Sequence, residues 1–218
     1  MKPAKPASLF FDMDGTLVDS EPIHYRAYGA LLAEYNISFP ETLFHSFVGK
    51  STLTNIQWIK QYYLLKEDET VLAAKKKEYF TSFLNTVTLF PHVQSLLTQA
   101  AQKYPLVVIT STKSNLTHII LEITHLTSFF SHIVTGDEGK AKPDPSLYNV
   151  GLTKMSIPPE NVVAFEDSLS GYMAASSASI HCICIPNKYT KEQFASSHSS
   201  HYTVPIVPTL EEALRDYL

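Results

Sequence analysis

The stretch "LFFDMDGTLVDSEPIHYR", residues 9–26, places two aspartates, Asp12 and Asp14, directly behind an apolar run. The apolar run predicts a buried strand, so both carboxylates would lie where that strand ends. Two like charges at a buried position cost free energy, because each carboxylate loses water and repels the other. A bound cation, or a reaction that uses both groups, would offset that cost. The motif therefore predicts a functional site.

A calcium-binding EF-hand loop is one alternative for such a pair. That loop needs a carboxylate or amide at its fifth position and a glycine at its sixth. Counted from Asp12, those two positions hold Thr16 and Leu17. The sequence therefore excludes an EF-hand.

The composition is that of a soluble globular protein, with 218 residues, 44% hydrophobic and 17% charged residues and a net charge of −4. This acidic balance argues against nucleic acid or an anionic membrane as the main partner. We find neither a signal peptide nor an apolar run long enough to span a membrane. Cys182 and Cys184 match no zinc or disulfide spacing, so we expect reduced, buried thiols in a cytoplasmic protein.

Five short apolar segments predict a parallel sheet, at residues 8–11, 106–109, 132–134, 162–165 and 181–185. They are continuously apolar, as expected for strands that are covered on both faces. Amphipathic segments lie between them, and strands that alternate with helices predict right-handed crossovers. We therefore predict an α/β fold with a Rossmann-like, three-layer core.

The block from residue 20 to residue 84 interrupts this alternation. It contains no convincing strand and has helical periodicity, as in Ile23, Ala27 and Leu31. At roughly 65 residues it is too long for a simple crossover and too regular for a loop. We predict that it is an inserted, all-helical cap domain that acts as a mobile lid.

The cap prediction assigns residues 1–19 and 85–218 to the core. Residues 84–93 would be the return linker, with Pro91 starting the next helix. The basic run Lys75–Lys77 is expected to be a solvated helix face. The Ser-rich stretch 195–203, which contains two histidines, is expected to be a surface loop.

Polar clusters follow four of the predicted strands: "DMDGT" (12–16), "TSTKSN" (110–115), "TGDEGKAKPDP" (135–145) and "EDSLSG" (166–171). Ligands of open α/β sheets bind at the carboxyl ends of the strands. Carboxylates from two strand ends make the type of oxygen site that Mg²⁺ favours. The side chains expected to converge there are Asp12, Asp14, Thr110, Lys142, Glu166 and Asp167.

These motifs, in this order and spacing, resemble the haloacid dehalogenase superfamily. With a helical block after the first motif, the chain is most similar to the phosphatase and β-phosphoglucomutase-like branch. The resemblance covers the chain from about Ser8 to Pro186. Three positions depart from the family pattern, because Ala141, His92 and Ser179 stand where the family has glycine. None of them is a catalytic position.

The resemblance implies that Asp12 is a nucleophile that becomes an aspartyl phosphate. Asp14 would protonate the leaving oxygen and then deprotonate the attacking water. Thr110 would bind a phosphoryl oxygen, and Lys142 would offset its charge or hold Asp12 in position.

The resemblance also implies a Mg²⁺ ion bound by the Asp12 carboxylate, the Asp14 main-chain carbonyl and Asp167. Glu166 would pair with Lys142 or reach the metal through water.

Candidate substrate contacts come from both predicted domains. In the cap they are His24, which is equally compatible with packing on a helix face, and Gly49 and Lys50 of "FVGKS", which could also form a helix-capping turn. The core candidates follow the second predicted strand: Ser111, Thr112 and Lys113.

We favour a Mg²⁺-dependent phosphatase for a small phosphorylated metabolite, with a sugar phosphate as the expected class, acting as a monomer. A β-phosphoglucomutase-like isomerase is the first alternative. Thr52 replaces the arginine that grips the second phosphate in such mutases, whereas Lys113 matches a phosphate-gripping lysine. A catalytically inactive ligand- or partner-binding module is the second alternative. Dehalogenation is disfavoured, because that chemistry has no use for Asp14.

Overall fold

A computed structural model describes residues 5–195 and 204–218. The chain forms two compact units. The core unit comprises the chain up to Asp19 and from Thr88 onward, and the helical unit is Ser20–Val87. His198 and His201 of the Ser-rich stretch lie outside the described residues.

The core unit contains a parallel sheet of five strands in the order β5-β4-β1-β6-β7. This confirms the predicted sheet, and two strands have the predicted bounds, while β5 begins two residues earlier. The strands are β1 (Ser8–Phe11), β4 (Leu106–Ile109), β5 (Phe130–Val134), β6 (Val162–Glu166) and β7 (His181–Cys184).

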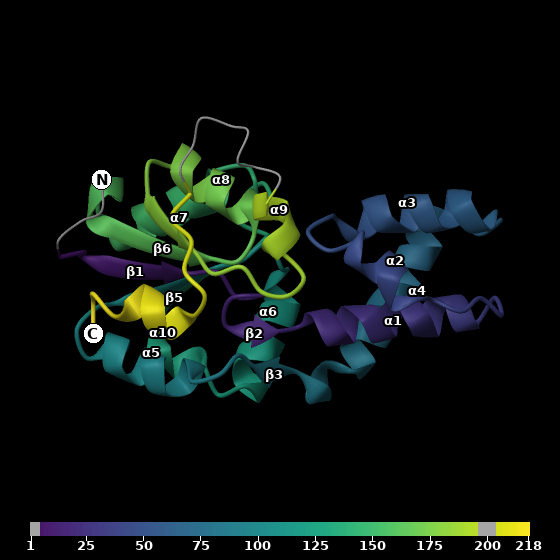
Figure 1. The fold of residues 1–218 in the computed structure, drawn as a ribbon, viewed down its shortest axis with the longest axis horizontal. Helices are drawn as coiled ribbons and strands as arrows, with labels where there is room; N and C mark the ends of the chain where they lie inside the picture. The colour runs from purple at the N-terminus through teal and green to yellow at the C-terminus, as the bar shows by residue number, and fades with distance from the viewer. Residues whose placement is uncertain (1–4, 196–203) are drawn as a thin grey trace. The chain divides into compact units, whose positions relative to one another are not determined.

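Helices cover both faces of this sheet, which confirms the three-layer prediction (Figure 1). One layer contains α5 (Val93–Ala101), α6 (Ser114–Ile123) and α10 (Leu210–Leu214), and the other contains α7 (Ser146–Met155) and α8 (Leu169–Ser177). Short elements complete the unit: η2 (Thr127–Phe129), η3 (Pro159–Asn161) and α9 (Lys191–Ala195). The central strands β1, β4 and β6 are buried along their whole length.

Close packing brings α7 onto the sheet at Gly151. A Cβ atom there would lie 2.7 Å from Ile109 Cδ1 and 2.9 Å from Phe10 Cε2, so a larger residue would force the helix away. Cys182 and Cys184 lie on β7 as free, buried thiols, as predicted. Within the described ranges, no helix is both long and apolar enough to cross a membrane.

Two of the missing family glycines coincide with left-handed backbone. His92 has φ of 63° and Ser179 has φ of 62°. L-residues pay roughly 1–2 kcal/mol for this conformation, which glycine adopts without that cost. The fold therefore keeps the turns that glycine would favour, at some expense of stability.

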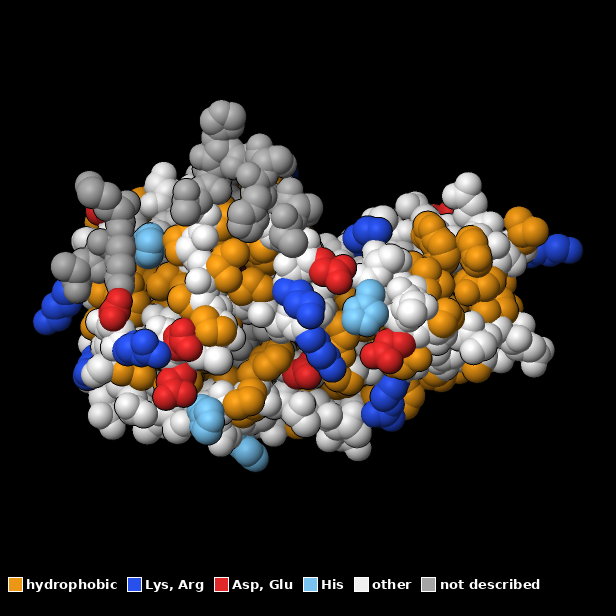
Figure 2. Space-filling view, in the orientation of Figure 1, with side chains coloured by type: hydrophobic (Ala, Val, Ile, Leu, Met, Phe, Trp, Pro, Cys, Tyr) orange, Lys and Arg blue, Asp and Glu red, His pale blue; other side chains and the backbone are white. Residues whose placement is uncertain are grey.

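The helical unit contains α1 (Glu21–Ala33), α2 (Glu41–His45), α3 (Thr52–Tyr63), α4 (Glu69–Ser82) and η1 (Leu84–Thr86). Side chains satisfy two helix N-termini: Ser51 accepts a hydrogen bond from the Thr54 amide, and Asp68 from the Thr70 amide. Figure 2 shows hydrophobic side chains gathered on the visible face of this unit. The exposed large apolar residues of the unit include Leu53, Trp58, Tyr62 and Leu64.

The prediction of a solvated Lys75–Lys77 face is wrong for Lys76, which is only 3% exposed. Leu72, Lys76 and Phe80 are spaced four residues apart, and they are the buried residues of α4. That spacing places them on one helix face, so Lys76 follows its apolar neighbours inward.

A second sheet of two strands joins the chain segments that lead to and from the helical unit. Here β2 (Val18–Asp19) pairs antiparallel with β3 (Thr88–Leu89). The sequence analysis took this return segment for a linker without a strand. It also placed the helix start at Pro91, whereas α5 begins at Val93 with His92 as its N-cap.

Candidate active site

Three buried carboxylates meet at the carboxyl ends of β1 and β6. Asp12 follows β1, Glu166 ends β6 and Asp167 comes next, and one oxygen of each lies within 4.8 Å of the others. The parallel register pairs Phe11 with Phe165, so the residues that follow emerge at the same level of the sheet. The strand order places this cluster at the topological switch point of the sheet. From β1, the chain first adds β4 and β5 on one side and later adds β6 and β7 on the other.

A buried lysine compensates part of this negative charge. Lys142 Nζ lies 2.5 Å from Asp12 Oδ1 and 2.7 Å from Glu166 Oε1, and it also donates to the Ile109 carbonyl at 2.7 Å. Burial alone lowers the pKa of Lys142, but the two carboxylates outweigh it and raise that pKa. Burial raises the pKa of Asp12, and Lys142 opposes the rise. The lysine is therefore held as a cation against Asp12.

Tyr148 completes this network, and the sequence analysis missed it. Its hydroxyl donates to Glu166 Oε1 at 2.5 Å, and its ring centroid lies 5.5 Å from Lys142 Nζ. Burial first, and Glu166 second, raise the pKa of Tyr148, which keeps the hydroxyl protonated as a donor. The only signal in the sequence was its place in the first turn of the helix after "KPDP".

The second oxygens of two carboxylates have no hydrogen-bond partner among the described residues. These atoms, Asp12 Oδ2 and Glu166 Oε2, are both buried. A buried carboxylate oxygen without a donor is costly unless a cation satisfies it. Hard oxygen ligands of this kind suit Mg²⁺, so the residues present fit the metal that the fold family implies.

Asp14 faces the neighbouring strand end. Its Oδ2 accepts a hydrogen bond from Thr112 Oγ1 at 2.8 Å and a longer one from Thr110 Oγ1 at 3.4 Å. The Thr112 amide in turn donates to Thr110 Oγ1 at 3.0 Å. The structure thus brings Asp14 together with Thr110 and Thr112, through a turn that Gly15 makes at φ of 89°.

The two remaining core candidates are bound to nearby loops. Ser111 Oγ accepts a hydrogen bond from the Lys142 amide at 3.1 Å, which links the ends of β4 and the "KPDP" segment. Lys113 Nζ donates to the Gly136 carbonyl at 2.8 Å and lies 3.2 Å from Asp137 Oδ1. In this arrangement the ammonium group of Lys113 serves the Gly136–Asp137 turn.

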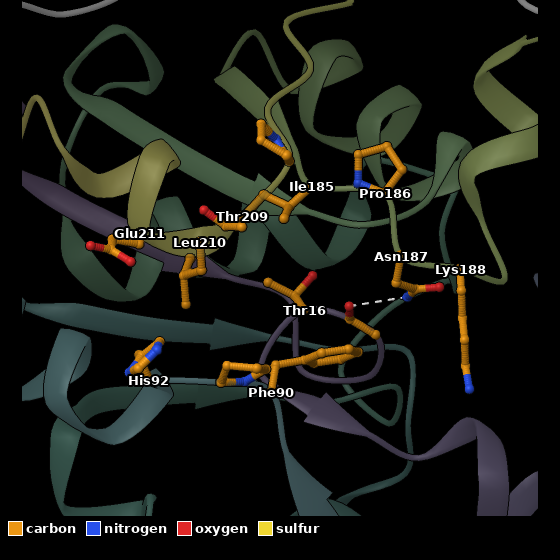
Figure 3. A pocket seen from close by; sticks show the side chains of 13 residues that line it. Thr16, Phe90, His92, Ile185, Pro186, Asn187, Lys188, Thr209, Leu210 and Glu211 are labelled. Atoms are coloured by element: carbon orange, nitrogen blue, oxygen red, sulfur yellow. Dashed lines mark hydrogen bonds between the residues drawn. The ribbon is translucent and has the colours of Figure 1, made fainter.

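A pocket of about 530 Å³ lies beside the motif loop in the core unit. It is lined by Gly15 and Thr16 but by none of the three clustered carboxylates. Figure 3 shows Phe90 on one side of it and Ile185 with Pro186 on the other. It is therefore distinct from the site of the predicted chemistry.

The comparisons with known proteins agree with this geometry. The model of the family described as haloacid dehalogenase-like hydrolase matches residues 9–185. The chain belongs to this family.

A phosphorylated carbohydrates phosphatase from Thermotoga maritima is 31% identical over 81% of this chain and 83% of its own. A fructose-1-phosphate phosphatase from Escherichia coli is 29% identical over 81% of this chain and 95% of its own. Among solved structures, a candidate β-phosphoglucomutase from Thermotoga maritima is 26% identical, with a TM-score of 0.78 over the full length of both chains. The chain is an enzyme of the phosphatase type within the haloacid dehalogenase-like family.

In the helical unit of this haloacid dehalogenase-like chain, the three predicted cap residues His24, Gly49 and Lys50 line one small pocket. Sequence analysis missed two polar residues of this pocket, Tyr28 and Asn55, which are buried. The Asn55 amide donates to the Tyr28 hydroxyl at 3.2 Å.

His24 both lines this pocket and packs on a helix. Its ring stacks on Phe80 with centroids 4.4 Å apart, and Nδ1 lies 2.7 Å from Lys76 Nζ. Burial, and then the Lys76 charge, lower the pKa of His24 well below its ordinary value, so the ring is neutral. The "FVGKS" stretch also combines both predicted roles, since Ser51 caps α3 while Gly49 and Lys50 line the pocket.

Proposed function

We propose that this protein is a Mg²⁺-dependent phosphatase that hydrolyses a small phosphorylated metabolite, of the sugar phosphate class, through an aspartyl phosphate. The observation that carries the proposal is the state of Asp12. One of its oxygens is held by Lys142, while the other is buried without a hydrogen-bond donor among the described residues, beside Glu166 and Asp167. A nucleophile for phosphorus needs a fixed position, which Lys142 gives to Asp12, and the acidic cluster beside it suits the cation that an anionic phosphoryl group requires.

In the first step, an Asp12 oxygen forms a bond to phosphorus while the bond from phosphorus to the leaving oxygen breaks. Asp14 donates a proton to that leaving oxygen. In the second step, a water molecule gives its proton to Asp14 and attacks phosphorus, which releases phosphate and restores Asp12. Thr110 and Thr112, which hold Asp14 at the end of β4, would set the direction of its carboxyl group.

The site must bring an anionic phosphoryl group to an anionic carboxylate. Lys142 supplies one positive charge at this position. Asp12, Asp167 and the Asp14 main-chain carbonyl would hold Mg²⁺, with Glu166 bound to Lys142 and Tyr148. When bound, Mg²⁺ would neutralise charge on the transferring group.

We propose that the helical unit is the cap and that it selects the substrate. It is joined to the core through Val18–Asp19 and Thr88–Leu89, which are hydrogen-bonded to each other as a two-stranded sheet. Two paired tethers favour a hinge, and closure would exclude bulk water from the chemistry. His24, Gly49 and Lys50 would then contact the leaving group.

The sugar phosphate class rests on the names of two relatives, which act on phosphorylated carbohydrates and fructose 1-phosphate. The polar lining of the pocket in the helical unit is compatible with a hydroxyl-rich leaving group, because Tyr28, Thr52 and Asn55 can each exchange hydrogen bonds. We expect a cytoplasmic monomer.

The test is phosphate release from a panel of phosphorylated sugars, organic acids and nucleotides, with and without Mg²⁺. We expect Mg²⁺-dependent release that is fastest for one group of sugar phosphates. Absence of release from every small substrate would contradict the proposal, as would equal release in the presence of EDTA.

A sugar-phosphate mutase is the second candidate, favoured by the full-length likeness to the candidate β-phosphoglucomutase. Two residues argue against it. Thr52 offers no charge for a second phosphate, and Lys113 is bound to Gly136 and Asp137. A mutase would require a sugar bisphosphate to start turnover and would release phosphate slowly. Product analysis with and without added bisphosphate distinguishes the two.

A further inference from the structure

Asn187, in the loop after β7, contacts two segments of the active site at once. Its Nδ2 donates to Asp167 Oδ2 at 2.9 Å and to the Gly15 carbonyl at 3.2 Å (Figure 3, dashed line to Gly15). One side-chain amide therefore links the end of β6 to the turn that follows Asp12 and Asp14.

The orientation of this amide is determined by its other contacts. Its Oδ1 accepts hydrogen bonds from the Tyr189 amide at 2.8 Å and the Thr190 amide at 3.2 Å. Both of those groups can only donate, so the carbonyl oxygen must face them and the NH₂ group must face Asp167. The Asn187 amide also donates to Thr190 Oγ1 at 3.1 Å, which fixes the backbone at the same position.

There is little room for Asp167 to move. A Cβ atom on Gly15 would lie 2.2 Å from Asp167 Oδ2, so this oxygen occupies the space that a side chain at position 15 would need. The Asn187 NH₂ group contacts the same oxygen and the carbonyl of the same glycine. The carboxylate is thus held between the loop and the amide, in an orientation set by both.

We propose that Asn187 is a positioning residue that orients Asp167 for Mg²⁺ and fixes the loop that carries Asp12 and Asp14. The inference rests on the proposed function, in which Asp167 is a metal ligand. Groups that hydrogen-bond to a metal ligand typically change metal affinity or activity by about 10- to 100-fold when they are removed.

The test uses the full chain with Asn187→Ser. A serine hydroxyl can still accept the turn hydrogen bonds from Tyr189 and Thr190, but it cannot donate to both Asp167 and Gly15. We expect the dissociation constant for Mg²⁺, measured by isothermal titration calorimetry, to rise by about tenfold or more. We expect kcat to fall by a comparable factor.

Thr190→Val is the matched control, because it removes a hydrogen bond from the same turn without touching Asp167. A role limited to the turn would give both variants the same loss of Tm and leave Mg²⁺ affinity unchanged. We expect the loss of Mg²⁺ affinity in Asn187→Ser alone.

Asn187→Asp guards against a folding defect in the serine variant. It keeps the turn acceptor but places a second carboxylate against Asp167. We expect its metal-free Tm to fall and Mg²⁺ to raise that Tm by more than it raises the wild-type Tm. An equal rise in both proteins would overturn the inference, as would unchanged Mg²⁺ affinity in Asn187→Ser. Absence of Mg²⁺ binding to the wild type would instead overturn the proposed metal site.

Discussion

Replacing Lys142 by methionine tests how the active-site charges are balanced. In metal-free buffer, the variant would leave the buried Asp12 and Glu166 without the cation that lies 2.5 and 2.7 Å away. It would also remove a hydrogen bond from the Ile109 carbonyl. Removing one partner of a buried ion pair typically costs about 3–5 kcal/mol, because an uncompensated charge remains in the interior. We expect Lys142→Met to lower the free energy of unfolding at pH 7 by that amount.

The loss should depend on pH in a defined direction. Burial already raises the pKa of Asp12, and without Lys142 that pKa should rise further above the unfolded value of about 4. A carboxyl group whose folded pKa is raised destabilises the fold above that pKa and ceases to do so as the pH falls and it becomes protonated. The deficit of Lys142→Met should therefore be largest at neutral pH and smaller at pH 5. In the wild type, the contribution of Lys142 is fully present throughout this range, since its own pKa is raised.

Urea denaturation in EDTA at pH 5 and pH 7 measures both effects. Lys154→Met is the control, because Lys154 pairs with Glu138 at 2.5 Å while the two side chains are 34% and 31% exposed. Such partly exposed pairs contribute roughly 1 kcal/mol or less. A loss at Lys142 no larger than at Lys154, or one that grows toward pH 5, would refute the reasoning.

Asp12→Asn should abolish turnover and covalent phosphorylation, because an amide is a poor nucleophile for phosphorus. Circular dichroism should show that the fold is intact. Phosphate release at the wild-type rate would contradict the proposed mechanism. EDTA should abolish phosphate release by the wild type, and added Mg²⁺ should restore it. Ca²⁺ should inhibit, because the larger and looser coordination shell of Ca²⁺ would misplace the phosphoryl group. The phosphate assay checks all three. Lys50→Ala should lower kcat/KM for the best sugar phosphate far more than for p-nitrophenyl phosphate, and equal losses would show that Lys50 does not discriminate. Leu64→Gly should raise the free energy of unfolding by about 0.5–1 kcal/mol, because Leu64 is 83% exposed and has a left-handed φ of 56°. The control Leu53→Gly, inside α3, should lower it by about 1 kcal/mol. Thermal unfolding of both variants tests the sign.

The fold of the core could be predicted because its strands carry a strong local signal. Each is a short run of apolar residues bounded by polar ones, and burial on both faces demands that pattern. The two-residue strands β2 and β3 could not be found in this way. Val18 pairs with Leu89 and Asp19 with Thr88, across 71 and 69 positions of sequence, and neither segment is long enough to show a period.

The active site likewise contains residues that the sequence predicted and residues that it did not. Asp12, Lys142 and Glu166 lie in motifs at strand ends, so their convergence follows from the sheet order. Tyr148 and Asn187 contact these groups from a helix and a loop. Tyrosine near a helix start and asparagine in a loop are common for structural reasons, and only the tertiary contacts distinguish these two.

Lys76 shows the opposite error, in which a local pattern misled. A run of three lysines on a helix is usually solvated, and the inward direction of the middle one depends on its position four residues from both Leu72 and Phe80. In the structure its ammonium group lies 2.7 Å from His24 Nδ1 and 4.9 Å from the Tyr28 ring centroid. Helical phase, and not composition, determined its burial.

The charge of the buried cluster gives the physical reason to expect a cation there. Asp12, Glu166 and Asp167 would carry three negative charges against the single positive charge of Lys142. Apolar residues of similar size would often be as stable as a buried ionic cluster, or more stable. An excess of negative charge is therefore a cost to the fold, and a divalent cation would bring the cluster to neutrality before the substrate adds its own charge. This would account for Asp12 in "DMDGT": a carboxylate beside Glu166 and Asp167 is unfavourable without a cation, and a bound divalent cation would offset that cost.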